Sequence, residues 1–172
     1  MLRVMLCIIM AVAVAQAWVE LSPVPDPAQV GTGSAIAYGN GKLWGVFPNE
    51  DSDWTYFEYY DPGAPGWVYP DDDLDYLENT AITFQWMNDG AVFVVGVEDG
   101  DPTLYWYDLA DPFWDEEEIE NFSLGAGASI AFRPVPVYRT MDHVPGWLYC
   151  LAGNGQEFWR YSIPGFGGAG GG

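Results

Sequence analysis

The sequence is poor in cysteine, histidine and basic residues, and each shortage excludes a class of protein. It has two cysteines, one histidine, and five lysines and arginines against 25 aspartates and glutamates. With His143 as its only histidine, the chain cannot build a metal site from several histidines. A serine, histidine and aspartate arrangement would depend on that one residue. The formal net charge of -20 argues against binding to nucleic acid or to an anionic membrane surface.

The first residues are typical of a secretory signal peptide. Residues 1–3 carry a basic side chain, residues 4–15 are uncharged and largely apolar, and residues 15–17 form a small-residue Ala-Gln-Ala pattern. The apolar run is too short for a membrane span. We expect residues 1–17 to be removed, which leaves a secreted, extracellular or periplasmic chain with no membrane span. An uncleaved N-terminal anchor is the alternative.

Removal of this segment also settles the cysteine chemistry. Cys7 lies within it, so the mature chain keeps only Cys150 and cannot form an internal disulfide. Cys150 stands in an apolar run, which favours a small buried side chain over a reactive thiol. The fold must therefore be stabilised by burial, and a chain that is 49% hydrophobic has the residues for it.

The chain repeats one pattern three times, and each copy is too short to be a domain by itself. Ile36, Ile82 and Ile130 mark the copies and stand 46 and then 48 residues apart. That period is the length of a four-stranded propeller blade. Each copy has a short apolar run, a second apolar run and an aromatic run: residues 34–38, 43–46 and 57–61; residues 80–84, 92–95 and 104–108; and residues 128–132, 148–151 and 158–162.

The first copy shows how such a blade begins. Asn40-Gly41 follows the first run, and both residue types accept the positive φ angles of a tight hairpin turn. Within the first run Ile36 alternates with Ala35 and Ala37, so large side chains line one face of the strand and small ones the other. The small face would let a neighbouring sheet approach closely.

Aromatic landmarks predict the outermost strands. Tyr60 and Tyr107 are 47 residues apart, and so are Trp67 and Trp114. We expect the fourth strand of a blade to begin at each of these tryptophans, with the indole packed back on the blade. The third copy has no such tryptophan and runs into a glycine-rich end.

These residues resemble the kelch repeat, whose consensus has a serine-containing apolar strand, an Asn-Gly turn, an aromatic strand, and then Tyr-Asp with a tryptophan a few residues on. The resemblance covers about residues 31–163 and departs from the consensus in lacking the glycine doublet after the second strand. It implies an all-β, kelch-like β-propeller of about three four-stranded antiparallel blades. Such a chain would form an incomplete propeller or half of a larger ring.

The repeat also predicts the organisation of the chain. A strand segment beginning at Trp18 precedes the first repeat and would close a blade lacking its outermost strand. Three blades are fewer than the four to eight of known propellers. Further blades in a longer chain are the favoured explanation, and a homodimer that completes the ring is the alternative. The expected divisions are a signal peptide, a strand segment, three repeats and a glycine-rich tail or linker: 1–17, 18–30, 31–78, 79–124, 125–166 and 167–172.

In a four-stranded meander successive turns alternate between two ends of the sheet, so the charges should separate. One end collects acidic residues: Glu50, Asp51, Asp53, Asp71, Asp72, Asp73, Asp75, Glu78, Glu98, Asp99, Asp101, Glu116, Glu117 and Glu118. The pairs Asp51 with Asp53 and Asp99 with Asp101 offer alternate carboxylates, which Ca²⁺ accepts, so these four are candidate ligands. A cationic partner, a salty habitat or solubility alone would also explain the acidity. No other cofactor is expected.

Basic residues collect at the opposite end, around an insertion in the third copy at residues 133–146. Long loops on rigid scaffolds often carry binding function. Candidate partner-binding residues are therefore Arg133, Arg139, His143 and the neighbouring Trp147. A decorative insertion is the alternative.

The sequence predicts a secreted, acidic, non-catalytic binding or structural scaffold for protein or glycan partners. The alternative is an extracellular carbohydrate-active enzyme or its accessory binding module, because paired carboxylates are plentiful. These carboxylates stand in acidic runs and not beside apolar strands that would raise one pKa. The sequence leaves open the alternative of a catalytic domain beyond Gly172.

Overall fold

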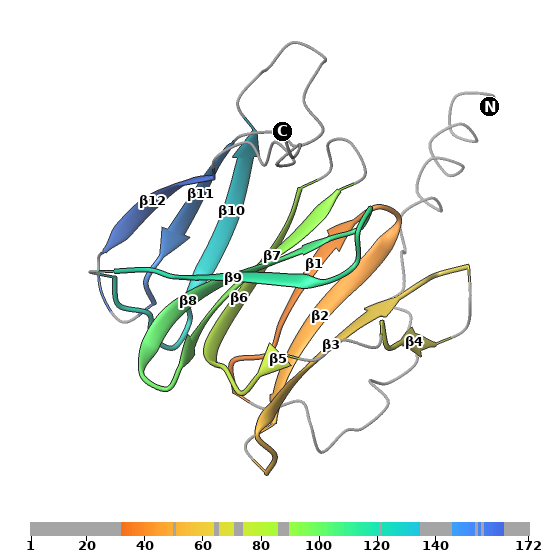
Figure 1. Ribbon diagram of the computed structural model, residues 1–172, viewed down its shortest axis with the longest axis horizontal. Coiled ribbons are helices and arrows are strands. Elements are labelled where there is room, and N and C mark those ends of the chain that lie inside the picture. Colours follow the sequence, from red (N-terminus) through yellow and green to blue (C-terminus); the bar gives the residue numbers. More distant parts are fainter. Residues whose placement is uncertain are drawn as a thin grey trace, which may run out of the picture.

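The chain folds into β-strands alone in the part that the computed structural model describes (Figure 1), and no helix there could cross a membrane. That part comprises residues 32–49, 51–63, 66–70, 74–85, 90–120, 122–134, 146–153, 155 and 157–163. The predicted signal peptide, the Trp18 segment and the glycine-rich tail lie outside it, and so do Arg139 and His143.

The strands form three separate antiparallel sheets in chain order. The first sheet has the order β1-β2-β3-β4, with β5 also paired to β3: β1 (Ala35–Gly39), β2 (Lys42–Asn49), β3 (Trp54–Tyr60), β4 (Trp67–Val68) and β5 (Leu74–Asp75). The second has the order β6-β7-β8-β9: β6 (Glu78–Gln85), β7 (Ala91–Glu98), β8 (Asp101–Asp108) and β9 (Trp114–Glu118). The third has the order β10-β11-β12: β10 (Ser129–Pro134), β11 (Gly146–Leu151) and β12 (Phe158–Ile163).

One sheet therefore corresponds to each copy of the repeat, as predicted. The expected four strands occur in the second sheet alone. The first sheet gains β5, because Leu74 of the linking segment is buried and pairs with Thr55. The third sheet has three strands among the described residues, in line with the missing tryptophan of the third copy.

Local sequence explains the hairpins and the outermost strands. Asn40 (φ 51°) and Gly41 (φ 76°) make the two-residue turn between β1 and β2, where Gly39 pairs with Lys42. The outermost strands β4 and β9 begin at Trp67 and Trp114, as expected. The indole of Trp114 lies 5.1 Å from the ring of Tyr107 on the adjacent strand. These predictions depend on local chemistry, and the structure confirms them.

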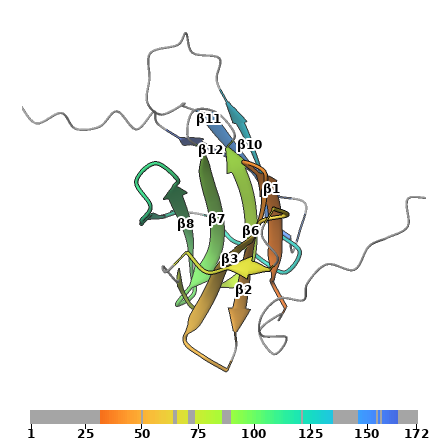
Figure 2. The ribbon, with the colours of Figure 1, turned by 90° about the vertical axis from the view of Figure 1, so that its right-hand side faces the viewer.

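Two hydrophobic cores hold the sheets in a row, and β6 contacts both β1 and β10. Figure 2 views this row from the side of the first sheet. Between the first and second sheets lies the first core: Trp44, Val46, Phe57, Leu74, Leu77, Ile82, Phe84, Val92, Val94, Tyr105 and Tyr107. Between the second and third lies the second: Ala81, Phe93, Val95, Leu104, Leu124, Leu148, Cys150 and Ile163. Each sheet thus covers its neighbour along the chain.

The alternation of large and small residues sets how the sheets meet. Ala35 and Ala37 of β1 pack against the first core, while Ile36, on the other face of β1, is 62% exposed. In β6 the large residues Ile82 and Phe84 enter that same core. The small-residue face of one sheet therefore meets the large-residue face of the next, which lets their innermost strands approach closely.

Candidate functional site

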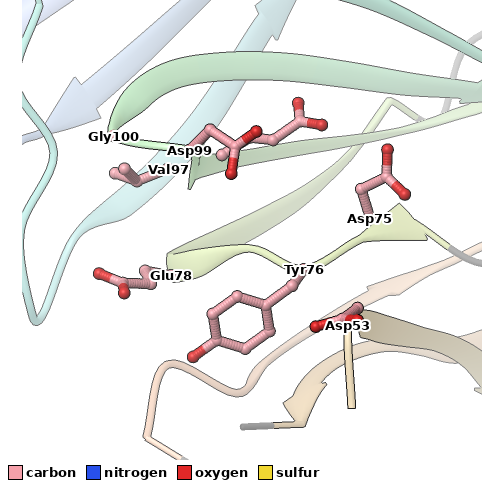
Figure 3. Close-up of a pocket in the computed structure, with 8 residues that line it drawn as sticks. Asp53, Asp75, Tyr76, Glu78, Val97, Asp99 and Gly100 are labelled. Atoms are coloured by element: carbon pink, nitrogen blue, oxygen red, sulfur yellow. The ribbon is translucent and has the colours of Figure 1, made fainter.

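Five carboxylates line a hollow of about 580 Å³ where the first and second sheets meet (Figure 3). They come from the turn before β3, from β5, from the start of β6, from the end of β7 and from the turn after it: Asp53, Asp75, Glu78, Glu98 and Asp99. Tyr76 lies among them and contributes an aromatic ring and a hydroxyl. The hollow thus draws residues from two copies of the repeat.

A buried leucine, Leu77, fixes the segment between β4 and β6 that supplies Asp75 and Tyr76. Leu77 is fully buried, and its backbone N–H donates to Thr55 Oγ1 of β3 at 2.8 Å. Gly96 of β7 makes room for it, because a Cβ atom at Gly96 would lie 2.9 Å from the Cβ of Leu77. The link therefore cannot be displaced without opening the first core.

The turn between β7 and β8 sets the position of Asp99. Asp99 (φ 50°) and Gly100 (φ 99°) form a two-residue hairpin turn closed by the pairing of Glu98 with Asp101. Aspartate tolerates this left-handed conformation better than most side chains, and glycine adopts it freely. Asp99 is exposed at the tip of the turn, so its carboxylate is available to solvent and to a partner.

Opposing interactions shift the pKa of the Glu98 carboxyl. The hydrogen bond that Tyr105 donates to Glu98 lowers the pKa of this carboxyl, but burial and the carboxylates of Glu116 and Asp75 outweigh it. The pKa of Glu98 is therefore raised above its ordinary value of 4.5. Burial and the same hydrogen bond raise the pKa of the Tyr105 hydroxyl.

A second, shallower hollow continues the negative surface over β8 and β9. It has a volume of about 310 Å³ and shares Glu98 and Asp99 with the first. Among the described residues that line the two hollows, none is basic. We call their carboxylates the acidic edge: Asp53, Asp75, Glu78, Glu98, Asp99, Asp101, Glu116, Glu117 and Glu118. The hydroxyl of Tyr161 donates to Glu117 and links the edge to the third sheet.

The four candidate calcium ligands do not converge as two pairs. Asp53 and Asp99 line the same hollow although they come from different copies, and Asp101 lines the adjoining one. Asp51 is exposed in the turn before β3, where its backbone N–H donates to Asn49 Oδ1 at 3.0 Å. Within the described ranges, no three His, Cys, Asp or Glu residues are arranged to hold a metal ion. Calcium binding stays a prediction.

Of the four candidate partner-binding residues, two lie in the described part, side by side. Arg133 is exposed on β10 and pairs across the hairpin with half-buried Trp147 on β11. The guanidinium of Arg160 on β12 lies 4.0 Å from the ring of Trp147, a cation–π contact. Arg160 is not among the residues predicted from the sequence, although it is the one basic residue in an aromatic run.

Comparisons with known proteins return no relative: no family model, no curated protein and no solved structure matches the chain.

Proposed function

We propose that this chain is an exported, non-catalytic binding scaffold whose kelch-like repeats form blades of a β-propeller, and whose acidic edge binds a basic segment of a partner protein. One observation carries the proposal: carboxylates from two repeats converge on one hollow with no basic residue lining its described part. A positively charged chain segment would relieve their mutual repulsion. Electrostatic complementarity of this kind also accelerates association and selects among partners.

The shape of the edge favours a peptide segment over a single metal ion. The two hollows adjoin, so the negative surface extends from the turn before β3 to β9. Tyr76 offers an aromatic face on which a lysine or arginine side chain can rest. An extended basic segment would contact several carboxylates in succession, which a single ion cannot do.

The rival proposal is a carbohydrate-active enzyme, and the raised pKa of Glu98 is the observation in its favour. A proton donor needs a free carboxyl group beside the scissile bond. Tyr105 already donates a hydrogen bond to Oε2 of Glu98, which engages that oxygen. The scaffold proposal expects no release of reducing sugar from polysaccharides, and release that Glu98→Gln abolishes would establish the rival.

The test of the scaffold is a binding titration with a defined probe. A fluorescent ten-residue peptide of alternating lysine and serine should bind the protein at low ionic strength and dissociate as salt is added. The doubly substituted Asp53→Asn, Asp99→Asn protein should bind it about tenfold more weakly, since each exposed ion pair contributes up to about 1 kcal/mol. A glutamate and serine peptide should not bind.

The matched control separates this site from the net charge. Asp111→Asn, Asp115→Asn removes the same two charges from a different hollow beside Phe113, so it should weaken binding less than about twofold. Equal losses in the two proteins would mean that the peptide senses overall charge alone and would refute the site. A parallel titration with CaCl₂ tests the metal prediction, in which bound Ca²⁺ would raise the melting temperature of the unsubstituted protein.

A further inference from the structure

The two internal contacts between sheets follow one rule of side-chain placement. From the first sheet, Trp44 and Phe57 reach across to the second. The ring of Phe57 lies 5.2 Å from Tyr107 and 4.7 Å from Trp114, while Trp44 lies 6.3 Å from Phe84. From the second sheet, Phe93 reaches the third and stacks on Phe132 at 5.4 Å. Each contact thus places aromatic rings from the small-residue face of one sheet on the large-residue face of the next.

The outer face of the third sheet carries aromatic residues at the positions that, in the first and second sheets, contact the next sheet. Among the described residues, no sheet lies beyond this face. Strand register places Tyr149 opposite Ala131, as it places Trp44 opposite Ala37. Tyr149 stacks on Phe158 at 5.8 Å and 17°, and Trp44 stacks on Phe57 at 5.5 Å and 17°. The pair that enters the first core therefore has a counterpart here, where Phe158 is 62% exposed.

The outer face of the first sheet carries residues at the positions that, in the second sheet, are contacted by the aromatic rings of the preceding sheet. By register, Tyr38 occupies the place that Phe84 has in the second sheet, and Trp67 that of Trp114. Tyr38 is 69% exposed, whereas Phe84 is buried. Figure 2 looks onto this end of the row of sheets.

Exposed apolar side chains concentrate at these two ends. Eight large hydrophobic residues are exposed in the described part, and strand alternation and register place five of them on the outer faces of the end sheets: Ile36, Tyr38, Trp54, Leu151 and Phe158. By register, Ile36 neighbours Tyr38 and Leu151 neighbours Phe158, and exposed apolar surface gathered in this way marks an interaction site. Leu151 and Phe158 lie on a face like the one that reaches across each internal contact, and Ile36, Tyr38 and Trp54 lie on a face like the one that is contacted. The two surfaces therefore complement each other, and neither complements a second copy of itself.

We propose that the outer face of the third sheet packs against the outer face of the first sheet in a second copy of this chain, and that two such contacts close a ring of six sheets. The second copy is the occupant because this chain supplies both halves of a contact that it already makes twice internally. Six sheets fall within the four to eight of known propellers. A heterologous contact closes when the rotation per sheet completes a circle.

The outer face of the third sheet is basic although the chain is strongly acidic. Arg133 and Arg160 are exposed on it, by the register of β10, β11 and β12. On the outer face of the first sheet, Glu58 is only 7% exposed within the single chain, so it adds little exposed charge there. The basic face of one copy would thus meet a second copy whose net charge is negative. This association does not depend on the acidic edge, which lies where the first and second sheets meet and over β8 and β9, and not on the end faces.

Sedimentation equilibrium of the whole chain tests the proposal with one variant for each face. The unsubstituted protein should have twice the mass of one chain. Tyr38→Asp and Phe158→Asp should each give a folded monomer, because both side chains are largely exposed within the single chain. Phe113→Asp is the matched control: it charges an exposed aromatic residue in the loop before β9, away from both end faces, and should leave the dimer intact. Circular dichroism confirms folding in each case.

Mixing the two variants gives the decisive result. Each mixed pair keeps one intact contact between an unaltered first-sheet face and an unaltered third-sheet face, so the mixture should recover a species of twice the chain mass. A contact between two like faces would be abolished by one variant and untouched by the other, and mixing would restore nothing. That pattern, or a monomeric unsubstituted protein, would overturn the proposal. Open assemblies larger than a dimer would overturn ring closure.

Discussion

The contact between the first two sheets should show as a large and non-additive loss of stability when Phe57 is truncated. Phe57 is fully buried and lies 5.5 Å from Trp44, 5.2 Å from Tyr107 and 4.7 Å from Trp114. Phe57→Ala removes a ring from this cluster and leaves a cavity that rigid strands cannot fill, so we expect a loss of about 3–5 kcal/mol in the free energy of unfolding. Phe113→Ala, at a position that is 44% exposed and lies on neither end face, should change it by less than about 1 kcal/mol.

A double-mutant cycle makes this prediction specific to the contact between the sheets. Phe57 belongs to the first copy of the repeat and Trp114 to the second, and their rings meet edge to face at 70°. Such an aromatic pair contributes about 0.5–1.5 kcal/mol beyond its buried area. Unfolding in urea of Phe57→Ala, Trp114→Ala and the double variant should therefore give a coupling energy of that size. Additive losses would refute the packing of these two sheets.

Three further predictions concern single residues. Gly39→Ala should lower the free energy of unfolding by about 1–3 kcal/mol in urea titrations, because its Cβ would clash with the ring of Phe84; an unchanged value would contradict this close approach. The pKa of Glu98 is raised above 4.5 in the folded protein, so its contribution to stability is full below pH 4.5 and is lost as pH rises through the raised pKa. Glu98→Gln should therefore reduce the fall in melting temperature from pH 4.5 to pH 7. Parallel curves of melting temperature against pH for the two proteins would argue against this. Burial raises the pKa of Cys150 to about 11, so a thiol reagent at pH 8 should modify it slowly until denaturant is added, and rapid modification of the folded chain would place it outside the second core.

Much of the fold was accessible from the sequence because it depends on short-range chemistry. The hairpin at Asn40-Gly41 follows from the backbone preferences of two residues. The strands that begin at Trp67 and Trp114 follow from a fixed distance to a preceding tyrosine. The division into three sheets follows from the repeat itself, since each copy carries its own hairpins.

The candidate site could be predicted from the sequence only in part, because it depends on how one sheet packs on the next. Meander topology predicts that Asp53 and Asp99 stand at the same end of their sheets, but their meeting in one hollow requires the stacking of those sheets. The burial of Leu77 was not predictable, since Leu74 and Leu77 stand three residues apart in an acidic run and do not follow the alternation of a strand. The hydrogen bond from Tyr105 to Glu98 joins one end of β7 to the interior of β8, and no local sequence pattern predicts it.

The central claim is that the three repeats form separate sheets that stack in chain order, and nuclear Overhauser contacts between aromatic side chains test it most directly. We predict contacts between Phe57 and Trp114, whose ring centroids are 4.7 Å apart, and between Phe93 and Phe132, at 5.4 Å, with none between Phe57 and Phe132. Contacts between Phe57 and Phe132 without the other two would mean that the copies interleave in one sheet pair, and would contradict the account.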